Sequence, residues 1–401
     1  MTHYDLIIIG AGIHGAGFSY VAQAMGLRCL LIEKSGQVGS ATSANSSKLI
    51  HGGLRYLESG QFNLVRECLR ERKRLLHAAP DLVSLQPFYI PIYTASQRSN
   101  ATIALGLSLY RLLGGGRFEF LNRTQRADLP LKHTHLTGLW QYWDCQTDDQ
   151  ALTRRVVHAA QNLGCTLSLN TYATAIQIAT PVQTTTPVQI KSPAEFHLRL
   201  NNGAQVRSRC LINAAGPWVN EVAALNTQLP QSPIQWVQGS HLVVNRPALR
   251  GCYYLESPLD GRPFFVLPWQ GQQLIGTTET PIADPSTAAI TEAERDYLIA
   301  SYQHFFADAA LSASDICATY CGVRVLPAQP PNPTRINRAK RDTQLLQHPQ
   351  VPGYLALYGG KLTSFYSTAL KGLEKLAPWL TCEAQGLKFT AAVTHPTFKP
   401  L

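Results

Sequence analysis

The chain has 401 residues, 45% hydrophobic and 15% charged, so it can bury a large core in two or three structural units. Its formal net charge of +10 favours anionic partners such as acidic lipid or a phosphorylated small molecule; because many soluble enzymes are basic, we expect no nucleic-acid role. Nine cysteines without a CxxC pair predict reduced thiols in a cytoplasmic protein, and we expect no disulfide framework, no metal site, no leader peptide and no bilayer-spanning segment.

The first forty residues predict a β-α-β unit that binds a dinucleotide. Residues 4–9 form a buried strand, which the glycines of GAGIHGAG (Gly10, Gly12 and Gly15) connect to a helix of small residues, and a second strand ends at Glu33. In such units the glycines let the backbone approach a pyrophosphate, the helix N-terminus faces its charge, and the acid binds the ribose diol. Glu33 disfavours a 2′-phosphate, so we expect FAD or NAD rather than NADP.

The stretch SANSSKLIHGGLRYLES, residues 43–59, is poor material for a hydrophobic core. Its position just after the β-α-β unit is where an extended cofactor would continue. Gly52 and Gly53 have no Cβ, so a planar ring can lie against their backbone. Hydroxyl donors for a pyrophosphate are Thr42, Ser43, Ser46 and Ser47.

Two helices are expected next. Residues 64–82 place Val65, Cys68, Leu69, Leu75 and Leu76 on one face, which predicts a solvated helix packed on the cofactor domain. Residues 98–118 are more apolar and have arginines at their margins. We expect a core helix there, and the alternative is a basic amphipathic helix that lies on anionic lipid.

Two later segments indicate a flavin. RCLINAAGPWVN contains a strand at 210–213 followed by a tight turn, and YLALYGGKLTSF contains a strand at 354–358 followed by two glycines and a helix. The positive end of that helix could stabilise the anionic pyrimidine of a reduced flavin. No second strand-linked GxGxxG provides a separate nicotinamide site, so one FAD is the simplest interpretation. Residues 180–193, rich in Thr, Pro and Gln, and 327–341 are expected to be irregular loops.

Seven strings occur in order from the first strand to about Thr363: GAGIHGAG, TSANSSKLIHGGLRYLE, NAAGPWVN, QGSHLVV, IGTTE, TYCGVRVLP and YGGKLTS. They resemble the FAD-dependent glycerol-3-phosphate dehydrogenases of the D-amino-acid-oxidase-like superfamily. This resemblance implies an α/β (α+β) fold, with a Rossmann-like FAD-binding domain of the glutathione-reductase type and an antiparallel-sheet substrate (roof) domain. We expect the FAD-binding domain at 1–86, 143–220 and 318–401, and the substrate domain at 87–142 and 221–317.

The sequence departs from that family in two places. Longer members have an extra C-terminal helical domain, whereas this chain stops at Leu401. Phe365 and Tyr366 stand where those enzymes usually have Tyr and Arg.

The resemblance also implies the site. It places Arg55, Arg324 and Lys361 at the substrate pocket, with Tyr56 and Thr363 nearby. Three cations suit a doubly charged phosphate better than one carboxylate, although some of them could instead form structural ion pairs. The residues expected at the cofactor are Gly10, Gly12, Ile13, His14, Gly15, Glu33, Lys34, Thr42, Ser43, Ser46, Ser47, Leu49, Ala173, Ala215, Gly216, Gly360, Lys361, Leu362 and Thr363.

His51 is either the catalytic base that takes the proton of the substrate hydroxyl, an orienter of that hydroxyl, or an imidazole packed against the flavin. Some amine-oxidising relatives attach flavin through a cysteine at the position of Cys321, but we expect non-covalent FAD.

Three functions stay open. The first is oxidation of glycerol-3-phosphate or a similar phosphorylated alcohol, a small anionic substrate, by hydride transfer to flavin N5, with quinone, another acceptor or oxygen receiving the electrons. The second is an amino-acid, amine or 2-hydroxy-acid oxidoreductase, in which Arg55, Tyr56 and Arg324 grip a carboxylate. The third is a non-catalytic FAD-bound protein. We expect a cytoplasmic location, with possible contact at the inner face of the membrane.

Overall fold

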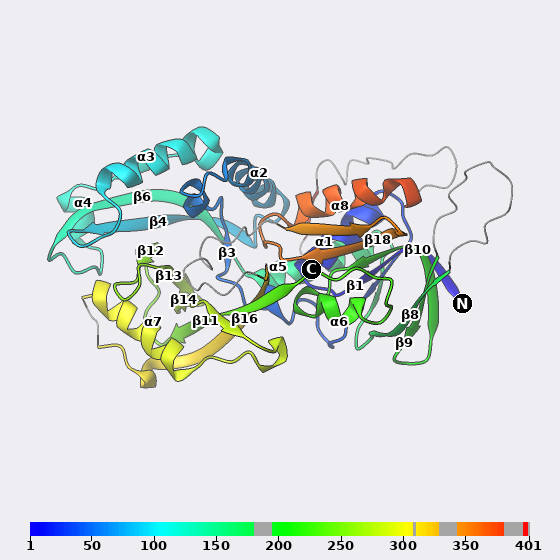
Figure 1. Cartoon of the computed structure of the whole chain (residues 1–401). Coiled ribbons are helices and arrows are strands. Elements are labelled where there is room, and N and C mark those ends of the chain that lie inside the picture. Colours follow the sequence, from blue (N-terminus) through cyan, green and yellow to red (C-terminus); the bar gives the residue numbers. More distant parts are fainter. Residues whose placement is uncertain (180–194, 308–309, 329–342, 381–395, 400–401) are drawn as a thin grey trace.

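The computed structural model describes residues 1–179, 195–307, 310–328, 343–380 and 396–399. Within these residues the chain forms two β-sheets that lie next to each other in an elongated molecule (Figure 1). The loop expected at 180–193 and nearly all of the irregular segment expected at 327–341 lie outside the described residues. No helix in the described part of the chain is long and apolar enough to cross a membrane.

The first sheet contains the predicted β-α-β unit. Its strands, in spatial order, are β17 (Gln344–His348), β18 (Val351–Tyr358), β10 (Gln205–Asn213), β1 (Thr2–Ile9), β2 (Cys29–Ile32) and β7 (Thr166–Ser168), and β8 (Ala173–Ala179) and β9 (Glu195–Leu200) extend it from β10. The central pairs are parallel, and β17, β8 and β9 add antiparallel pairs. Helices α1 (Ile13–Ala24), α5 (Asp149–Asn162) and α8 (Phe365–Leu380) cover one face of this sheet, and α6 (Val219–Ala223) packs on the other together with residues of β8 and β9. This coverage explains why Leu6–Ile9 of β1 and all of β2 are apolar.

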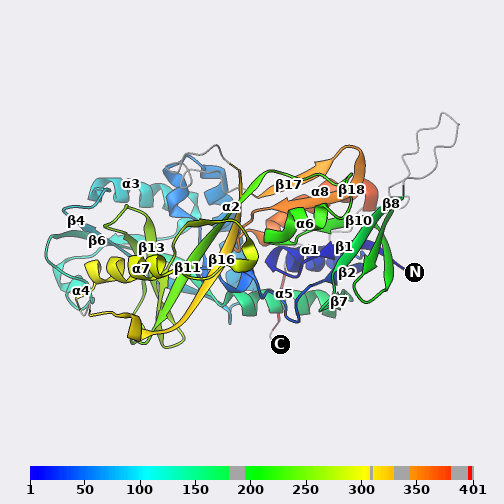
Figure 2. The same cartoon turned by 60° about the horizontal axis from the view of Figure 1, so that its bottom comes forward.

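Helix α1 packs against α5 and α8, and Figure 2 shows α1 and α5 side by side. The small residues of α1 permit this packing. A Cβ on Gly17 would lie 2.7 Å from Cδ2 of Phe365, so the glycine lets α8 approach. The short helix α6 follows β10.

The second sheet is the predicted roof. Its order is β15 (Thr280–Ile282), β11 (Ile234–Val244), β14 (Gln272–Gly276), β13 (Pro263–Trp269), β12 (Cys252–Glu256), β4 (Val83–Tyr93), β6 (Leu136–Thr147) and β3 (Leu49–Ile50); β16 (Ile316–Pro327) pairs with β11 and β5 (Phe118–Phe120) with β6. The pairs are antiparallel except for β12 with β4, which is parallel. Figure 1 shows α3 (Asn100–Tyr110) and α7 (Glu292–Phe305) on opposite sides of these strands; the remaining helices are α2 (Phe62–Ala78) and α4 (Arg123–Ala127).

Three of the four expected domain boundaries fall inside strands of the second sheet, and the fourth, at 220, falls inside α6. Boundaries at 86, 143 and 318 lie within β4, β6 and β16, each of which hydrogen-bonds over its length to a partner of that sheet. The division into an FAD-binding and a substrate domain stays a prediction. By hydrogen bonding, all three of these strands belong to the second sheet.

Both predicted helices have the expected buried faces. Helix α2 buries Val65, Cys68, Leu69 and Leu75, while Leu76 is half-buried. Helix α3 buries Ile103, Leu107 and Tyr110 in the core above β4 and β6, which agrees with the core interpretation for that face. Its other side leaves Leu105 72% exposed, and Leu112, in the turn Arg111–Gly115 that follows, is 83% exposed.

Candidate functional site

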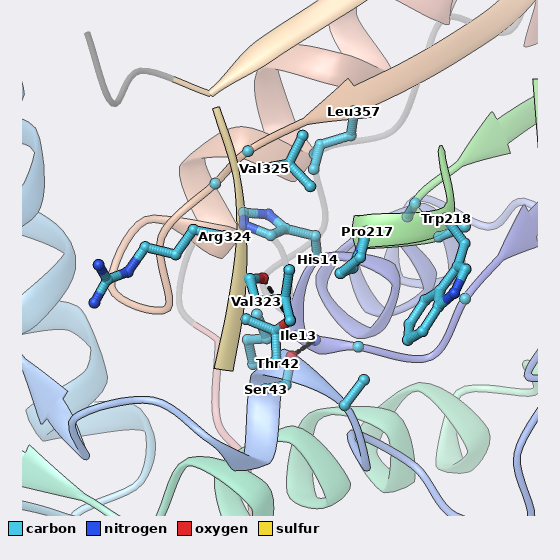
Figure 3. A pocket seen from close by; sticks show the side chains of 18 of the residues that line it. Ile13, His14, Thr42, Ser43, Pro217, Trp218, Val323, Arg324, Val325 and Leu357 are labelled. Carbon is cyan, nitrogen blue, oxygen red and sulfur yellow. Dashed lines mark hydrogen bonds between the residues drawn. The ribbon is translucent and has the colours of Figure 1, made fainter. Parts of the chain in front are cut away.

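A cavity of about 930 Å³ lies where the two sheets meet. The first sheet contributes the carboxyl ends of β1, β2, β10 and β18, and the second contributes β3, β11 and β16. In open α/β sheets, ligands bind outside the carboxyl ends of the strands. Figure 3 shows Ile13, His14, Thr42 and Ser43 gathered at the start of α1, with Arg324 extending to one side and Trp218 lying on the other.

The glycine turn between β1 and α1 forms one wall of the cavity. Gly10 has φ +99°, and a Cβ there would lie 2.7 Å from the carbonyl oxygen of Ala214. The N–H of Ile13, at the start of α1, donates to Ser43 Oγ at 2.9 Å, so this serine caps one N–H of the helix end at the wall. A Cβ on Gly15 would lie 1.8 Å from the carbonyl oxygen of Gly10, and Gly15 supports the turn from behind rather than lining the cavity.

Glu33 ends β2 at the same cavity, as predicted from the sequence. Its Oε2 accepts the N–H of Ala11 at 2.7 Å and its Oε1 accepts the N–H of Ser35 at 2.9 Å. Each carboxylate oxygen keeps a second acceptor position, which a ribose hydroxyl could use. Lys34 and Ala173 line the cavity as well.

The serines that follow bind protein groups in this structure. Ser46 lines the cavity, but its hydroxyl donates to Asp149 Oδ2 at 2.6 Å, whereas the sequence predicts a phosphate contact for it. Lys48 Nζ donates to the other oxygen of Asp149 at 2.6 Å. Ser47 Oγ lies 3.0 Å from His241 Nε2. Ser46 therefore helps to fix this loop to α5 through a buried carboxylate.

His51 lies at the cavity wall, in the turn after β3. Its N–H donates to Thr363 Oγ1 at 3.2 Å, and Gly53 adopts φ +76° to complete the turn. Burial lowers the pKa of His51, the Asp144 carboxylate opposes this by raising it, and nearby cations lower it further. The imidazole is therefore neutral at pH 7 and can accept a proton.

Two of the three expected cations line the cavity. The Nζ atom of Lys361 is buried, lies 4.1 Å from the ring centroid of Tyr56, and has no hydrogen-bond partner among the described residues. Arg324 Nη1 donates to Glu279 Oε1 at 3.0 Å, so this cation has an ion-pair partner. Arg55 does not line the cavity, although its charge lowers the pKa of the neighbouring His51.

Two buried histidines form further parts of the wall. Neither ring nitrogen of His14 has a hydrogen-bond partner within the described ranges, and burial lowers its pKa to about 4. A Cβ on Gly360 would lie 2.2 Å from His14 Nε2, so Gly360 leaves room for the imidazole. His241, which sequence reasoning missed, stacks on Tyr320 with ring centroids 4.9 Å apart; burial lowers its pKa to about 3. The string QGSH was its only signal.

Most of the predicted cofactor residues line this one cavity. They are Gly10, Gly12, Ile13, His14, Glu33, Lys34, Thr42, Ser43, Ser46, Ser47, Leu49, Ala173, Ala215, Gly216, Gly360, Lys361, Leu362 and Thr363, together with His51, Tyr56 and Arg324 of the expected substrate site. Cys321 does not line it: its Sγ lies 3.1 Å from Ser240 Oγ, and burial raises its pKa, which disfavours the thiolate that covalent attachment would need.

The residues present fit an extended dinucleotide. The N-terminus of α1 would meet the negative charge of a pyrophosphate, and the tight glycine turn leaves its backbone exposed to the cavity. The ring nitrogens of His14, which have no partner in the described part of the chain, would meet polar atoms of a bound group.

Comparisons with known proteins agree with this geometry. Residues 5–365 match the family model described as FAD dependent oxidoreductase. A glycerol-3-phosphate dehydrogenase of Synechocystis sp. is 35% identical over 395 residues, which cover 94% of this chain and 70% of that protein. A D-erythritol 1-phosphate dehydrogenase of Brucella abortus is 33% identical, covering 93% of this chain and 73% of that protein.

Among solved structures, the glycerol-3-phosphate dehydrogenase from Bacillus halodurans complexed with FAD has a TM-score of 0.74 at 23% identity, over 98% of this chain and 67% of that one. The similarity supports the two-sheet fold, and the resemblance found in the seven sequence strings is confirmed. The chain belongs to the FAD-dependent oxidoreductase (DAO) family and is an FAD-dependent enzyme similar to glycerol-3-phosphate dehydrogenases.

Proposed function

We propose that this enzyme oxidises a small phosphorylated alcohol, with glycerol-3-phosphate as the first candidate. The observation that carries the proposal is the buried Nζ of Lys361, which has no hydrogen-bond partner in the part of the chain that the structure describes. A buried ammonium is costly unless an anion pairs with it. The names of the relatives, which act on glycerol-3-phosphate and D-erythritol 1-phosphate, support a phosphate as that anion.

Lys361 differs from the other two expected cations, Arg324 and Arg55, in its surroundings. Arg324 is engaged by Glu279 and must share its donors between that carboxylate and a substrate. Arg55 stands outside the cavity wall and contributes its charge from a distance. Lys361 and Arg324 would bind the substrate, with Tyr56 beside them.

FAD, when bound, takes up two electrons from the substrate carbon. We assign its pyrophosphate to the turn Gly10–Gly15 with Thr42 and Ser43, its adenosine to Glu33, Lys34 and Ala173, and its ring to the segment Gly360–Thr363. His51 would accept the proton of the substrate hydroxyl, and its lowered pKa keeps it in the neutral form that this role requires.

The second candidate, a carboxylate substrate held by Arg55, Tyr56 and Arg324, has less support because Arg55 does not line the cavity and Arg324 is paired. The relatives are enzymes, which favours catalysis over a non-catalytic FAD protein.

The experiment is an anaerobic titration of the flavin absorbance with L-glycerol-3-phosphate, repeated with Lys361→Met and Lys371→Met. Lys371 is the matched control: it lies in α8, pairs with Glu67 and is half exposed. We expect rapid bleaching in the wild type and in Lys371→Met, and loss of bleaching in Lys361→Met. If a hydroxy acid or an amine bleaches the wild type and glycerol-3-phosphate does not, the phosphate proposal is wrong.

We also propose a peripheral contact with an anionic membrane surface at the cytoplasmic side, which would suit electron delivery to a quinone rather than to oxygen. Leu105 and Leu112 are seven residues apart on one side of α3 and its following turn, are 72% and 83% exposed, and have the exposed Arg111 beside them. Flotation with anionic vesicles should carry the wild type and Leu259→Asp, a control on another exposed leucine, but not the Leu105→Asp/Leu112→Asp double variant. Wild-type protein that stays at the bottom would contradict the contact.

A further inference from the structure

The backbone N–H of Gly52 is hydrogen-bonded to side chains from distant parts of the chain. It donates to Tyr110 Oη at 3.0 Å and lies 3.3 Å from Asp144 Oδ2. Tyr110 ends α3 and Asp144 belongs to β6. Because Gly52 directly follows His51, whose own N–H is held by Thr363, the backbone of His51 is fixed from both of its ends.

Asp144 is the centre of this arrangement. Its side chain is 1% exposed, and it accepts the Tyr110 hydroxyl at 2.7 Å and Arg72 Nη1 at 2.7 Å. Arg72, from α2, also donates to the carbonyl oxygens of Trp143 and Gly115. The buried carboxylate thus accepts hydrogen bonds from α2 and α3 and lies within 3.4 Å of the Gly52 nitrogen, so three elements meet at it.

The packing around Gly52 leaves no space for movement toward Tyr110. A Cβ on Gly52 would lie 2.3 Å from Tyr110 Oη and 2.4 Å from Cδ2 of Leu69. The Tyr110 ring is itself packed edge-on against Tyr142, with ring centroids 6.0 Å apart. A displacement of the hydroxyl would therefore be transmitted to the Gly52 peptide.

We propose that Tyr110 and Asp144 are positioning residues, which clamp the Gly52 N–H and so hold His51 at the cavity wall, in a role that rests on the oxidation proposed above. Neither residue lines the cavity, so neither touches the reacting groups. The clamp acts through the backbone of the turn His51–Gly53. A site whose supporting contacts are loose by about 1 Å loses much of its activity.

The test variant is Tyr110→Phe, which keeps the buried ring and removes only the hydroxyl. Replacing Asp144 instead would leave Arg72 buried without its carboxylate and could prevent folding. The matched control is Tyr253→Phe: Tyr253 is 0% exposed, does not line the cavity, and its hydroxyl has no hydrogen-bond partner among the described residues. Two quantities are measured on the FAD-loaded proteins: amide hydrogen exchange at Gly52, and the rate and substrate dependence of anaerobic flavin bleaching.

In Tyr110→Phe we expect the Gly52 amide to exchange about tenfold faster and the limiting rate of flavin bleaching to fall about tenfold. A factor of about ten corresponds to the free energy of one lost hydrogen bond to a buried donor. The half-saturating substrate concentration should stay within about twofold, since no substrate contact is removed. Tyr253→Phe should match the wild type in every readout.

An unchanged exchange rate at Gly52 in Tyr110→Phe would show that Tyr110 does not hold the turn. Faster exchange with an unchanged bleaching rate would show that holding the turn does not matter for the oxidation. Either result overturns the proposal. If glycerol-3-phosphate fails to bleach the wild type, the proposed function is wrong. In that case the exchange data still test whether Tyr110 holds the turn. The bleaching rates of the wild type and Tyr110→Phe are then compared with whichever electron donor does bleach the wild type.

Discussion

His14 shows how burial sets the charge of a residue at the cavity wall. It lies in the first turn of α1, where burial lowers its pKa from 6.5 to about 4 and no described residue within hydrogen-bonding distance compensates its ring nitrogens. The folded protein therefore keeps this imidazole neutral while the unfolded chain protonates it near pH 6.5. Between these two values the unfolded state binds more protons, so the free energy of unfolding falls as the pH drops.

Between pH 6.5 and about 4, His14 alone should lower the free energy of unfolding by about 1.4 kcal/mol for each pH unit. The total decrease should reach about 3 kcal/mol below pH ~4. Urea denaturation of FAD-free His14→Asn across this pH range should show a free energy of unfolding that depends less steeply on pH than that of the FAD-free wild type, by the equivalent of about one bound proton. The control His133→Asn, at an exposed histidine outside the cavity, should keep the wild-type slope. Equal slopes for wild type and His14→Asn would contradict a neutral His14 in the fold.

Residue positions were predictable where they depend on local backbone chemistry. Gly10 is an example, because the string GAGIHGAG around it predicts the turn between β1 and α1, and its φ of +99° is a conformation that glycine permits. The partner of Ser46 was not predictable, since Asp149 lies 103 residues further along the chain and meets it only after folding. His241 was missed for the same reason: its buried place follows from the cross-strand pairing of β11 with β16, which puts it opposite Tyr320.

Among the elements, the loop before β3 depends on one ion pair. Lys48 and Asp149 have side chains 6% and 0% exposed, and Lys48 Nζ also lies 4.7 Å from the Tyr320 ring and 5.2 Å from the Trp269 ring. The pair joins this loop to the N-terminus of α5, and the two rings join it to the roof. The loop thus connects the first sheet to the second.

Asp149→Asn should destabilise the protein by about 3–5 kcal/mol, because it leaves the Lys48 ammonium buried without its anion. Glu292→Gln, in the exposed pair with Arg295, should leave the urea midpoint where it is. Urea denaturation followed by tryptophan fluorescence measures both; Trp269, one of six tryptophans in the chain, lies on the roof side of the loop. A midpoint shift of the same size in the two variants would contradict a special role for the buried pair.

Sheet topology was predictable only in part. The alternation of apolar strands, glycine turns and helix gives the parallel β1-α1-β2 unit directly, and the strand-like runs of the roof are present as β11, β13 and β14. The parallel pair of β4 with β12 was not expected in an antiparallel roof. It joins segments about 160 residues apart, and nothing in the local sequence of either strand specifies that neighbour.

Across the whole molecule, the cavity is built from both sheets and from segments between Ile9 and Thr363. A group bound there would contact the ends of β1, β10 and β18 on one side and β11 and β16 on the other, so its binding free energy would stabilise both halves together. A ligand that binds only the folded state stabilises it by RT ln(1 + [L]/Kd), about 2.7 kcal/mol at a free concentration of 100 Kd.

Removing FAD should therefore lower the free energy of unfolding by about that amount relative to protein in FAD at 100 Kd, and adding FAD back should restore it. Hydrogen exchange locates the effect: amides at the carboxyl ends of β1 and β10 and in β16 should exchange faster without FAD, whereas those of α7 and β12, whose residues do not line the cavity, should change little. A loss of protection confined to the first sheet would contradict a cofactor site shared between the two sheets, because β11 and β16 would then be shown to hold their place without it.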